Sequence, residues 1–249
     1  MPFSVFLYAG ANSFLSQREI PASILNLIET KHDITYGGLS MTIGGELVPV
    51  CTVTLNASSG PIFFEHHILL WRDPQIEVTA KVLKGLGKRI LAGLPVVVTE
   101  AKGSGRIAFS RDAAGQLVFV ELAAGEQIDV REHQFLFATA QVEYGYYRVS
   151  GISNMMFGGT GFFIDTFKGP GLVALHGYGN VLERELKPGE QIDVEPGAFM
   201  YKDGPVKMET LKLGVKTGLM GGTNLFLNRF TGPGKLGIQS MTFHLQTGD

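Results

Sequence analysis

The sequence predicts an all-β fold, a sandwich or barrel of short antiparallel strands organised as three repeated units of about 65 residues. Three observations lead to this prediction: an internal repeat, turn signals every eight to twelve residues or so, and an excess of glycine. Glycine makes up 33 of the 249 residues, or about 13%, against a usual share of roughly 7%. Such a composition favours short strands joined by many turns.

The repeat is clearest in the second half of the chain. Gly125–Val130 and Gly189–Val194 share the sequence Gly-Glu-Gln-Ile-Asp-Val. Each copy is followed by Gly-Gly-Thr, then by an apolar strand that ends in Gly-Pro-Gly at 169–171 or 232–234. A weaker copy lies upstream, where 96–105 is similar to 162–171. We therefore predict an N-terminal extension at 1–35 and a single β domain at 36–249, with units near 37–102, 103–168 and 169–231 followed by closing strands.

The third unit shows most clearly the alternation of short strands and tight turns that is typical of a β protein. Alternating or apolar runs predict its strands, which are Leu172–His176, Val181–Leu186, Gln191–Val194 and Phe199–Tyr201. Between them, Gly177–Asn180 and Lys187–Glu190 have the Gly, Asn and Pro residues that tight turns require. Parallel strands would need helical crossovers, which the sequence lacks, so the strands are expected to be antiparallel.

One short helix is predicted, within Ile20–Lys31. Ile24, Leu27 and Ile28 have the i, i+3, i+4 spacing of one helical face, and Pro21 suits an early helical position. The predicted helix belongs to the N-terminal extension.

The order of these motifs resembles the altered-inheritance-of-mitochondria family. That family includes bacterial proteins of unknown function and a mitochondrial inner-membrane member linked to respiratory-complex and cristae organisation. By fold it is grouped with the tryptophan RNA-binding attenuation protein. The resemblance covers about Tyr36 to Leu245 and implies a double-stranded β-helix-like sandwich with internal pseudo-threefold symmetry. It implies no catalytic residues, and shared fold alone implies neither tryptophan nor RNA binding.

Charge and cysteine content exclude several classes of protein. A formal charge of −2 gives no overall attraction to nucleic acid or anionic lipid. Cys51 is the single cysteine, so no intramolecular disulfide and no thiolate-rich zinc site can form. We expect no signal peptide and no membrane span, and we predict a cytoplasmic protein.

The sequence contains two patterns that could carry chemistry. Glu65-His66-His67 is its densest cluster of metal-ligand residues, but neighbours in a strand point to opposite faces, so we expect no metal there. Glu126/Asp129 and Glu190/Asp193 are paired carboxylates at matching positions of two units. A catalytic centre is normally unique, so this duplication indicates a structural motif after a turn. We predict no enzyme, no cofactor and no metal.

Three Gly-flanked apolar segments, one in each unit, are the candidate functional surface. If the units are related by a threefold axis, these segments lie at equivalent places. We expect an interface or apolar ligand site that contains Leu86, Ile90, Leu91, Met156, Phe157, Leu219 and Met220, with a basic patch at Lys84, Lys88 and Arg89. The alternative, that these segments close the ends of the core, is favoured by the usual burial of Met and Phe.

The function predicted from these features is that of a non-enzymatic oligomeric scaffold or interaction module. We expect a homo-oligomer, with a trimer favoured, that contacts other proteins. A peripheral contact with a membrane is compatible with this prediction. The alternative is a small-molecule-binding module with its site between units or subunits. RNA binding comes third and is not expected, because Arg106, Arg111, Arg131, Lys168 and Lys235 are scattered along the sequence.

Overall fold

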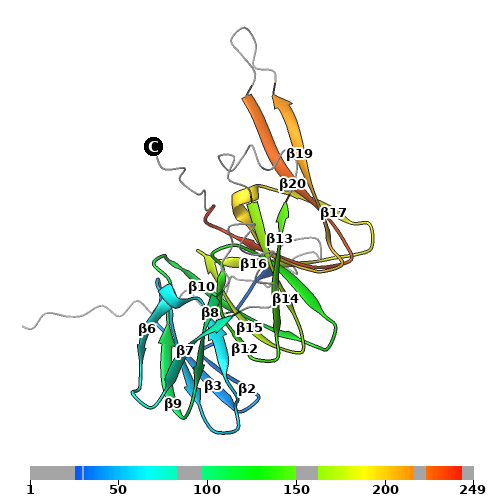
Figure 1. Cartoon of the computed structure of the whole chain (residues 1–249). Coiled ribbons are helices and arrows are strands. Elements are labelled where there is room, and N and C mark those ends of the chain that lie inside the picture. The colour runs from blue at the N-terminus through cyan, green and yellow to red at the C-terminus, as the bar shows by residue number, and fades with distance from the viewer. Residues whose placement is uncertain (1–25, 30, 83–96, 150–161, 216–222, 243–249) are drawn as a thin grey trace, which may run out of the picture.

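Figure 1 shows the computed structural model, which describes residues 26–29, 31–82, 97–149, 162–215 and 223–242. Within these residues the chain forms antiparallel strands and two short 3-10 helices. The strands make sheets of seven, six, five and three strands. The predicted all-β class is therefore confirmed.

The described strands after residue 49 fall into three sets of six, which we name in chain order. The first strand set is β4 (Val50–Leu55), β5 (Ile62–Phe64), β6 (Leu69–Arg72), β7 (Glu77–Val82), β8 (Val97–Lys102) and β9 (Gly105–Phe109). The second is β10 (Gly115–Leu122), β11 (Gln127–Arg131), β12 (Phe135–Thr139), β13 (Glu143–Val149), β14 (Phe162–Lys168) and β15 (Gly171–Tyr178). The third is β16 (Val181–Leu186), β17 (Gln191–Val194), β18 (Phe199–Asp203), β19 (Lys207–Val215), β20 (Thr223–Thr231) and β21 (Gly234–Gln239).

Each set has the same internal pairing. Its first and third strands pair with its sixth, as in β10–β15 and β12–β15. Its second and fourth strands pair with its fifth, as in β11–β14 and β13–β14. The first and third sets repeat all of these pairings. A set therefore consists of two three-stranded halves, the first-sixth-third half and the second-fifth-fourth half.

Neighbouring sets join edge to edge. The six-stranded sheet has the order β10-β15-β12-β5-β8-β7, so a half of the second set continues into a half of the first. The seven-stranded sheet, β1-β16-β21-β18-β11-β14-β13, joins the third set to the second in the same way. In Figure 1 the first set lies at the lower left and the β19–β20 hairpin of the third set at the upper right.

The core is continuous across the first junction between sets. Phe109, on β9, lies 4.8 Å from the ring of Phe64 and 5.3 Å from that of Phe137 on β12, measured between ring centroids. Cys51, on β4, is fully buried in the same cluster. Aromatic side chains from two sets thus fill one interior, which makes the junction part of the core.

The segment before β4 differs from the prediction. Residues 20–25 and 30 of the predicted helix lie outside the described residues, but Asn26–Leu27 forms a short strand, β1, paired with β16. β2 (Asp33–Tyr36) and β3 (Leu39–Gly44) form a hairpin that extends the first set through β4. Pairing with an available strand edge has replaced the helical periodicity at Leu27, because tertiary contacts override weak local propensity.

Candidate functional site

Neighbouring strand sets meet at two junctions, where an edge strand of one set pairs with an edge strand of the next. At the first junction β12 lies antiparallel to β5, with Ala138 opposite Phe63. At the second, β18 lies antiparallel to β11, with Lys202 opposite Asp129. Both junctions pair the third strand of one set with the second strand of the preceding set.

A buried ion pair lies at the centre of the second junction. The Nζ of Lys202 donates to Oδ2 of Asp129 at 2.6 Å, and the two side chains are only 4% and 5% exposed. Asp129 also accepts hydrogen bonds from the Tyr147 hydroxyl at 3.1 Å and the Gln127 amide at 2.7 Å. Burial, followed by the nearby Asp129 carboxylate, raises the pKa of Tyr147 and keeps its phenol a donor. The carboxylate is thus compensated as a buried charge must be.

Two arginines add hydrogen bonds across the junctions. Arg131, on β11, is buried and donates to the carbonyl of Gly197 at 2.7 Å, in the connection between β17 and β18. Arg111, which follows β9, donates to the Glu65 carboxylate at 2.8 Å and to the carbonyl of Phe135 at 2.5 Å. Each guanidinium links one set to the next.

In the first and the third strand sets, the strands that correspond to the junction strands lie at sheet edges. Among the described strands, β6 ends the five-stranded sheet β2-β3-β4-β9-β6, and β17 ends the three-stranded sheet β17-β20-β19. β6 exposes Leu70 by 53% and Trp71 by 42%. An exposed aromatic on a sheet edge is a feature of interaction surfaces.

The charges beside these edges are exposed as well. On β17, Asp193 accepts two hydrogen bonds from Arg229 at 2.7 and 2.8 Å, and this pairing lowers the pKa of the Asp193 carboxyl. Next to β6, the guanidinium of Arg106 lies 5.6 Å from the centre of the Trp71 ring. The β6 edge therefore carries an exposed aromatic beside a cation, and the β17 edge carries an exposed ion pair.

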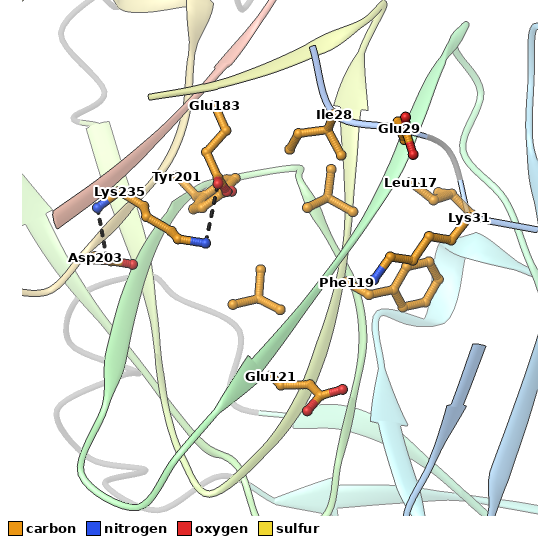
Figure 2. A pocket seen from close by; sticks show the side chains of 12 residues that line it. Ile28, Glu29, Lys31, Leu117, Phe119, Glu121, Glu183, Tyr201, Asp203 and Lys235 are labelled. Atoms are coloured by element: carbon orange, nitrogen blue, oxygen red, sulfur yellow. Dashed lines mark hydrogen bonds and ion pairs between the residues drawn. The ribbon is translucent and has the colours of Figure 1, made fainter. Parts of the chain in front are cut away.

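A pocket of about 250 Å³ lies between β10 of the second set and the sheet of the third set (Figure 2). Among its carboxylates, Glu183 accepts a hydrogen bond from the Tyr201 hydroxyl and lies 3.2 Å from Nζ of Lys235. The backbone N–H of Lys235 donates to Asp203 at 2.8 Å. Leu117 and Phe119 supply apolar lining on the other side.

Acidic groups outnumber basic ones around this pocket. Its carboxylates are Glu29, Glu121, Glu183 and Asp203, and its ammonium groups are Lys31 and Lys235. Burial raises the pKa of Asp203, and burial together with Glu183 raises that of Tyr201. The pocket is thus suited to a small molecule that carries a positive charge or several hydrogen-bond donors.

The apolar loops and the basic patch predicted from the sequence lie outside the described residues. They are Leu86, Ile90, Leu91, Met156, Phe157, Leu219, Met220, Lys84, Lys88 and Arg89. The structure describes the strands that flank them, which pair with each other up to Val82–Val97, Val149–Phe162 and Val215–Thr223. Each predicted loop therefore connects the fourth and fifth strands of a set.

The cluster Glu65-His66-His67 does not lie in a strand, as the sequence argument had assumed. His66–Ile68 forms a 3-10 helix, η1, and Nε2 of His67 lies 3.4 Å from the Glu65 carboxylate. Within the described ranges, no group of three His, Cys, Asp or Glu side chains is close enough to hold a metal ion.

The paired carboxylates have structural roles in the turns and strands. Glu126 and Glu190 accept hydrogen bonds at 2.8 Å from the backbone N–H of Ala123 and Lys187, each closing its own turn. Asp129 and Asp193 lie on the strands that follow. The interpretation as a motif after a turn thus fits both copies, although the two aspartates have different neighbours.

The edge residues Trp71 and Arg72 were missed by the sequence analysis. A signal for them exists, because the third strands align as Trp71-Arg72-Asp73, Phe137-Ala138-Thr139 and Tyr201-Lys202-Asp203. The first unit is the most diverged, which hides this alignment until the strand pairings are known.

Comparisons with known proteins show the fold through a solved structure and the family through a family model. The chain is similar to a crystal structure of a Streptococcus pyogenes protein determined as a structural genomics target, with a TM-score of 0.63 and 20% identity over 82% of this chain and 94% of that one. A search of curated proteins gave no significant match. The described residues contain no helix that is both long and apolar enough to cross a bilayer. The family model described as "Mitochondrial biogenesis AIM24" matches residues 41–241, and the chain therefore belongs to the AIM24 family.

Proposed function

We propose that this protein is a non-enzymatic oligomeric scaffold or interaction module. One observation carries the proposal: Trp71 is 42% exposed, whereas its counterparts Phe137 and Tyr201 are 0% and 2% exposed. The counterparts are identified by their pairing, since the three residues lie opposite Ala108, Ala174 and Gly237 after the same register shift. A neighbouring strand pairs beside this aromatic position in the second and third sets, whereas in the first set no described strand does so.

The three strand sets are, in this proposal, the three internal repeats predicted from the sequence. The identical pairings within the sets support this, and in this proposal the repeats span 50–109, 115–178 and 181–239. The pseudo-threefold arrangement, the trimer and the cytoplasmic location remain predictions. A scaffold made of repeats has surfaces of the same design at several places, which suits it to organise other proteins.

Native mass spectrometry of the untagged protein tests the scaffold. We expect an oligomer, and we expect Trp71→Asp to shift it toward the monomer because a charge replaces an apolar contact on β6. Leu47→Asp is the matched control, because Leu47 is 76% exposed but lies in the β3–β4 connection away from this edge. A wild-type protein that is monomeric at micromolar concentration would contradict the proposal.

The pocket around Glu183 supports a second candidate, a module that binds a small cationic molecule. Its position between the second and third sets matches the predicted site between units. The same mass spectra test it, since a bound compound adds a reproducible mass to each chain. Glu121→Gln should weaken retention of that compound with little effect on folding, and a mass equal to that of the bare chain would argue against the module.

A further inference from the structure

We propose that β17 of one copy pairs antiparallel with β6 of a second copy, joining chains head to tail with Arg72 opposite Asp193. This inference rests on the proposed oligomeric scaffold and names its partner, a second copy of this chain. Three observations support it: the composition of the sheets, the register of the internal junctions, and the residues that this register brings together.

The sheet orders show two unmatched halves. In both larger sheets, the first-sixth-third half of one set is followed by the second-fifth-fourth half of the preceding set. The five-stranded sheet contains such a first half, β4-β9-β6, without a following half among the described strands. The three-stranded sheet β17-β20-β19 is a second half that, in the part of the chain that the structure describes, has no preceding one. A second copy supplies to each the half that it lacks.

These two edges are at opposite ends of the molecule. In Figure 1 β6 lies at the lower left and β17 at the upper right, with the second set between them. Pairing between chains is therefore heterologous: each copy donates one edge and receives one. The predicted trimer corresponds to a closed ring of three such contacts.

The internal junctions fix the register. Thr139 lies opposite Ile62 at the first junction, and Asp203 lies opposite Ile128 at the second. Ile62, Ile128 and Ile192 are equivalent, because each pairs with the matching residue of a fifth strand, namely Ala101, Phe167 and Phe230. Applied to the free edges, the same register places Asp73 opposite Ile192, Arg72 opposite Asp193, and Trp71 opposite Val194.

A repeated hydrogen bond supports the equivalence of the third strands. Asp73 and Asp203 accept from the backbone N–H of Arg106 and Lys235 at 2.9 and 2.8 Å. Thr139 accepts from the N–H of Leu172 at 3.1 Å in the same way. The last residue of this alignment therefore has one role in all three sets.

The residues brought together are complementary in charge. Arg72 and Asp193 correspond to Lys202 and Asp129, which form the buried ion pair of the second junction. In the single chain Arg72 donates to the carbonyl of Ile76 at 2.9 Å, and Asp193 is held by Arg229. Trp71 meets the apolar Val194, as Tyr201 meets Val130. The free edges thus repeat the two pairs of the second junction: a cation opposite an anion, and an aromatic residue opposite Val.

Charge reversal tests the pairing in the full chain. Arg72→Asp and Asp193→Arg should each weaken self-association about tenfold or more, because each places like charges opposite one another. The double variant should restore association. Both positions are exposed, so thermal unfolding should show that the single variants remain folded.

Disulfide trapping tests the register itself. Chains with Arg72→Cys mixed with chains with Asp193→Cys should form an intermolecular disulfide, since directly opposite residues lie within disulfide range. Gln191→Cys, two residues away, is the matched control and should cross-link far less. The native Cys51 is fully buried and does not compete. An oligomer that persists in both charge variants without cross-linking would overturn this pairing and leave the scaffold standing, whereas a monomeric wild type would overturn both.

Discussion

The hexapeptide Gly-Glu-Gln-Ile-Asp-Val occurs twice, and its two copies have opposite surroundings. In 125–130 the aspartate, Asp129, is buried and pairs with Lys202 from the neighbouring set. In 189–194 the aspartate, Asp193, is exposed and pairs with Arg229 of its own set. The local structure is the same, because Glu126 and Glu190 close the same turn. The environment differs because β18 covers β11, whereas β17 ends its sheet.

This difference shows that the role of a residue in a repeat protein depends on the position of its repeat in the series. An inner copy has neighbours on both sides, while a terminal copy has one exposed edge. The same aspartate can therefore stabilise the fold in one copy and remain accessible to a partner in the other.

Removal of the basic partner of each aspartate tests whether burial makes the two copies differ in stability. Lys202→Ala leaves Asp129 buried without its counter-ion, which should lower the free energy of unfolding by about 3 kcal/mol or more. Arg229→Ala, the matched variant, should cost much less, because Asp193 is exposed and can be solvated. Urea denaturation of both variants measures the difference. Equal losses would show that burial at the junction does not distinguish the two copies.

As the pH falls, folding stability should decrease first through the buried His176 of the second set and only later through the exposed Asp193–Arg229 pair. Burial, followed by the nearby Arg111, lowers the pKa of His176 from 6.5 to about 4. The unfolded imidazole therefore binds its proton first, so stability falls as pH falls from about 6.5 to about 4, by roughly 3 kcal/mol in total. The Asp193 carboxyl has a lowered pKa, so its contribution is lost only as pH falls below about 4.

Urea denaturation across this pH range measures the slope. His176→Gln should flatten the dependence between pH 6.5 and 4 whatever its effect at pH 7. An unchanged slope in that variant would place the sensitivity at another group. Asp193→Asn should leave this part of the profile as it is in the wild type.

The smallest expected effect concerns the third partner of Asp129. Tyr147→Phe removes the hydroxyl that donates to this carboxylate at 3.1 Å, which should cost about 1–2 kcal/mol. The third set has Leu211 at the matching place, paired with Leu227 as Tyr147 is with Ile164. Leu211→Ala, in the set whose aspartate is exposed, measures the loss of side-chain packing alone. A neutral Tyr147→Phe variant would show that Lys202 and Gln127 suffice to hold Asp129.

Strand positions in the third set could be predicted because their signals are local. Val181–Leu186 and Gln191–Val194 are predicted and observed with the same bounds. Pro188 and Gly189 mark the turn between them, and Gly189 has the positive φ of 77° that favours glycine. Such residues determine the backbone within a few positions, which a single sequence shows directly.

The partners of these strands could not be predicted in the same way. The pairings β5–β12 and β11–β18 join residues more than 70 positions apart, and no local pattern specifies them. Leu27 carries helical spacing yet lies in β1, because an edge of β16 was available. The candidate edges were missed for this reason: exposure of Trp71 is a property of where the series ends, and not of its neighbours in sequence.

The reactivity of Cys51 can report the opening of the first strand set. The side chain is fully buried on β4, and burial raises its thiol pKa to about 12, so almost no reactive thiolate is present near neutral pH. Alkylation of the native protein then requires that the strands over Cys51 separate. The rate of thiol labelling therefore reports how often the half-sheet that carries β6 comes apart, in a single chain or in an assembly.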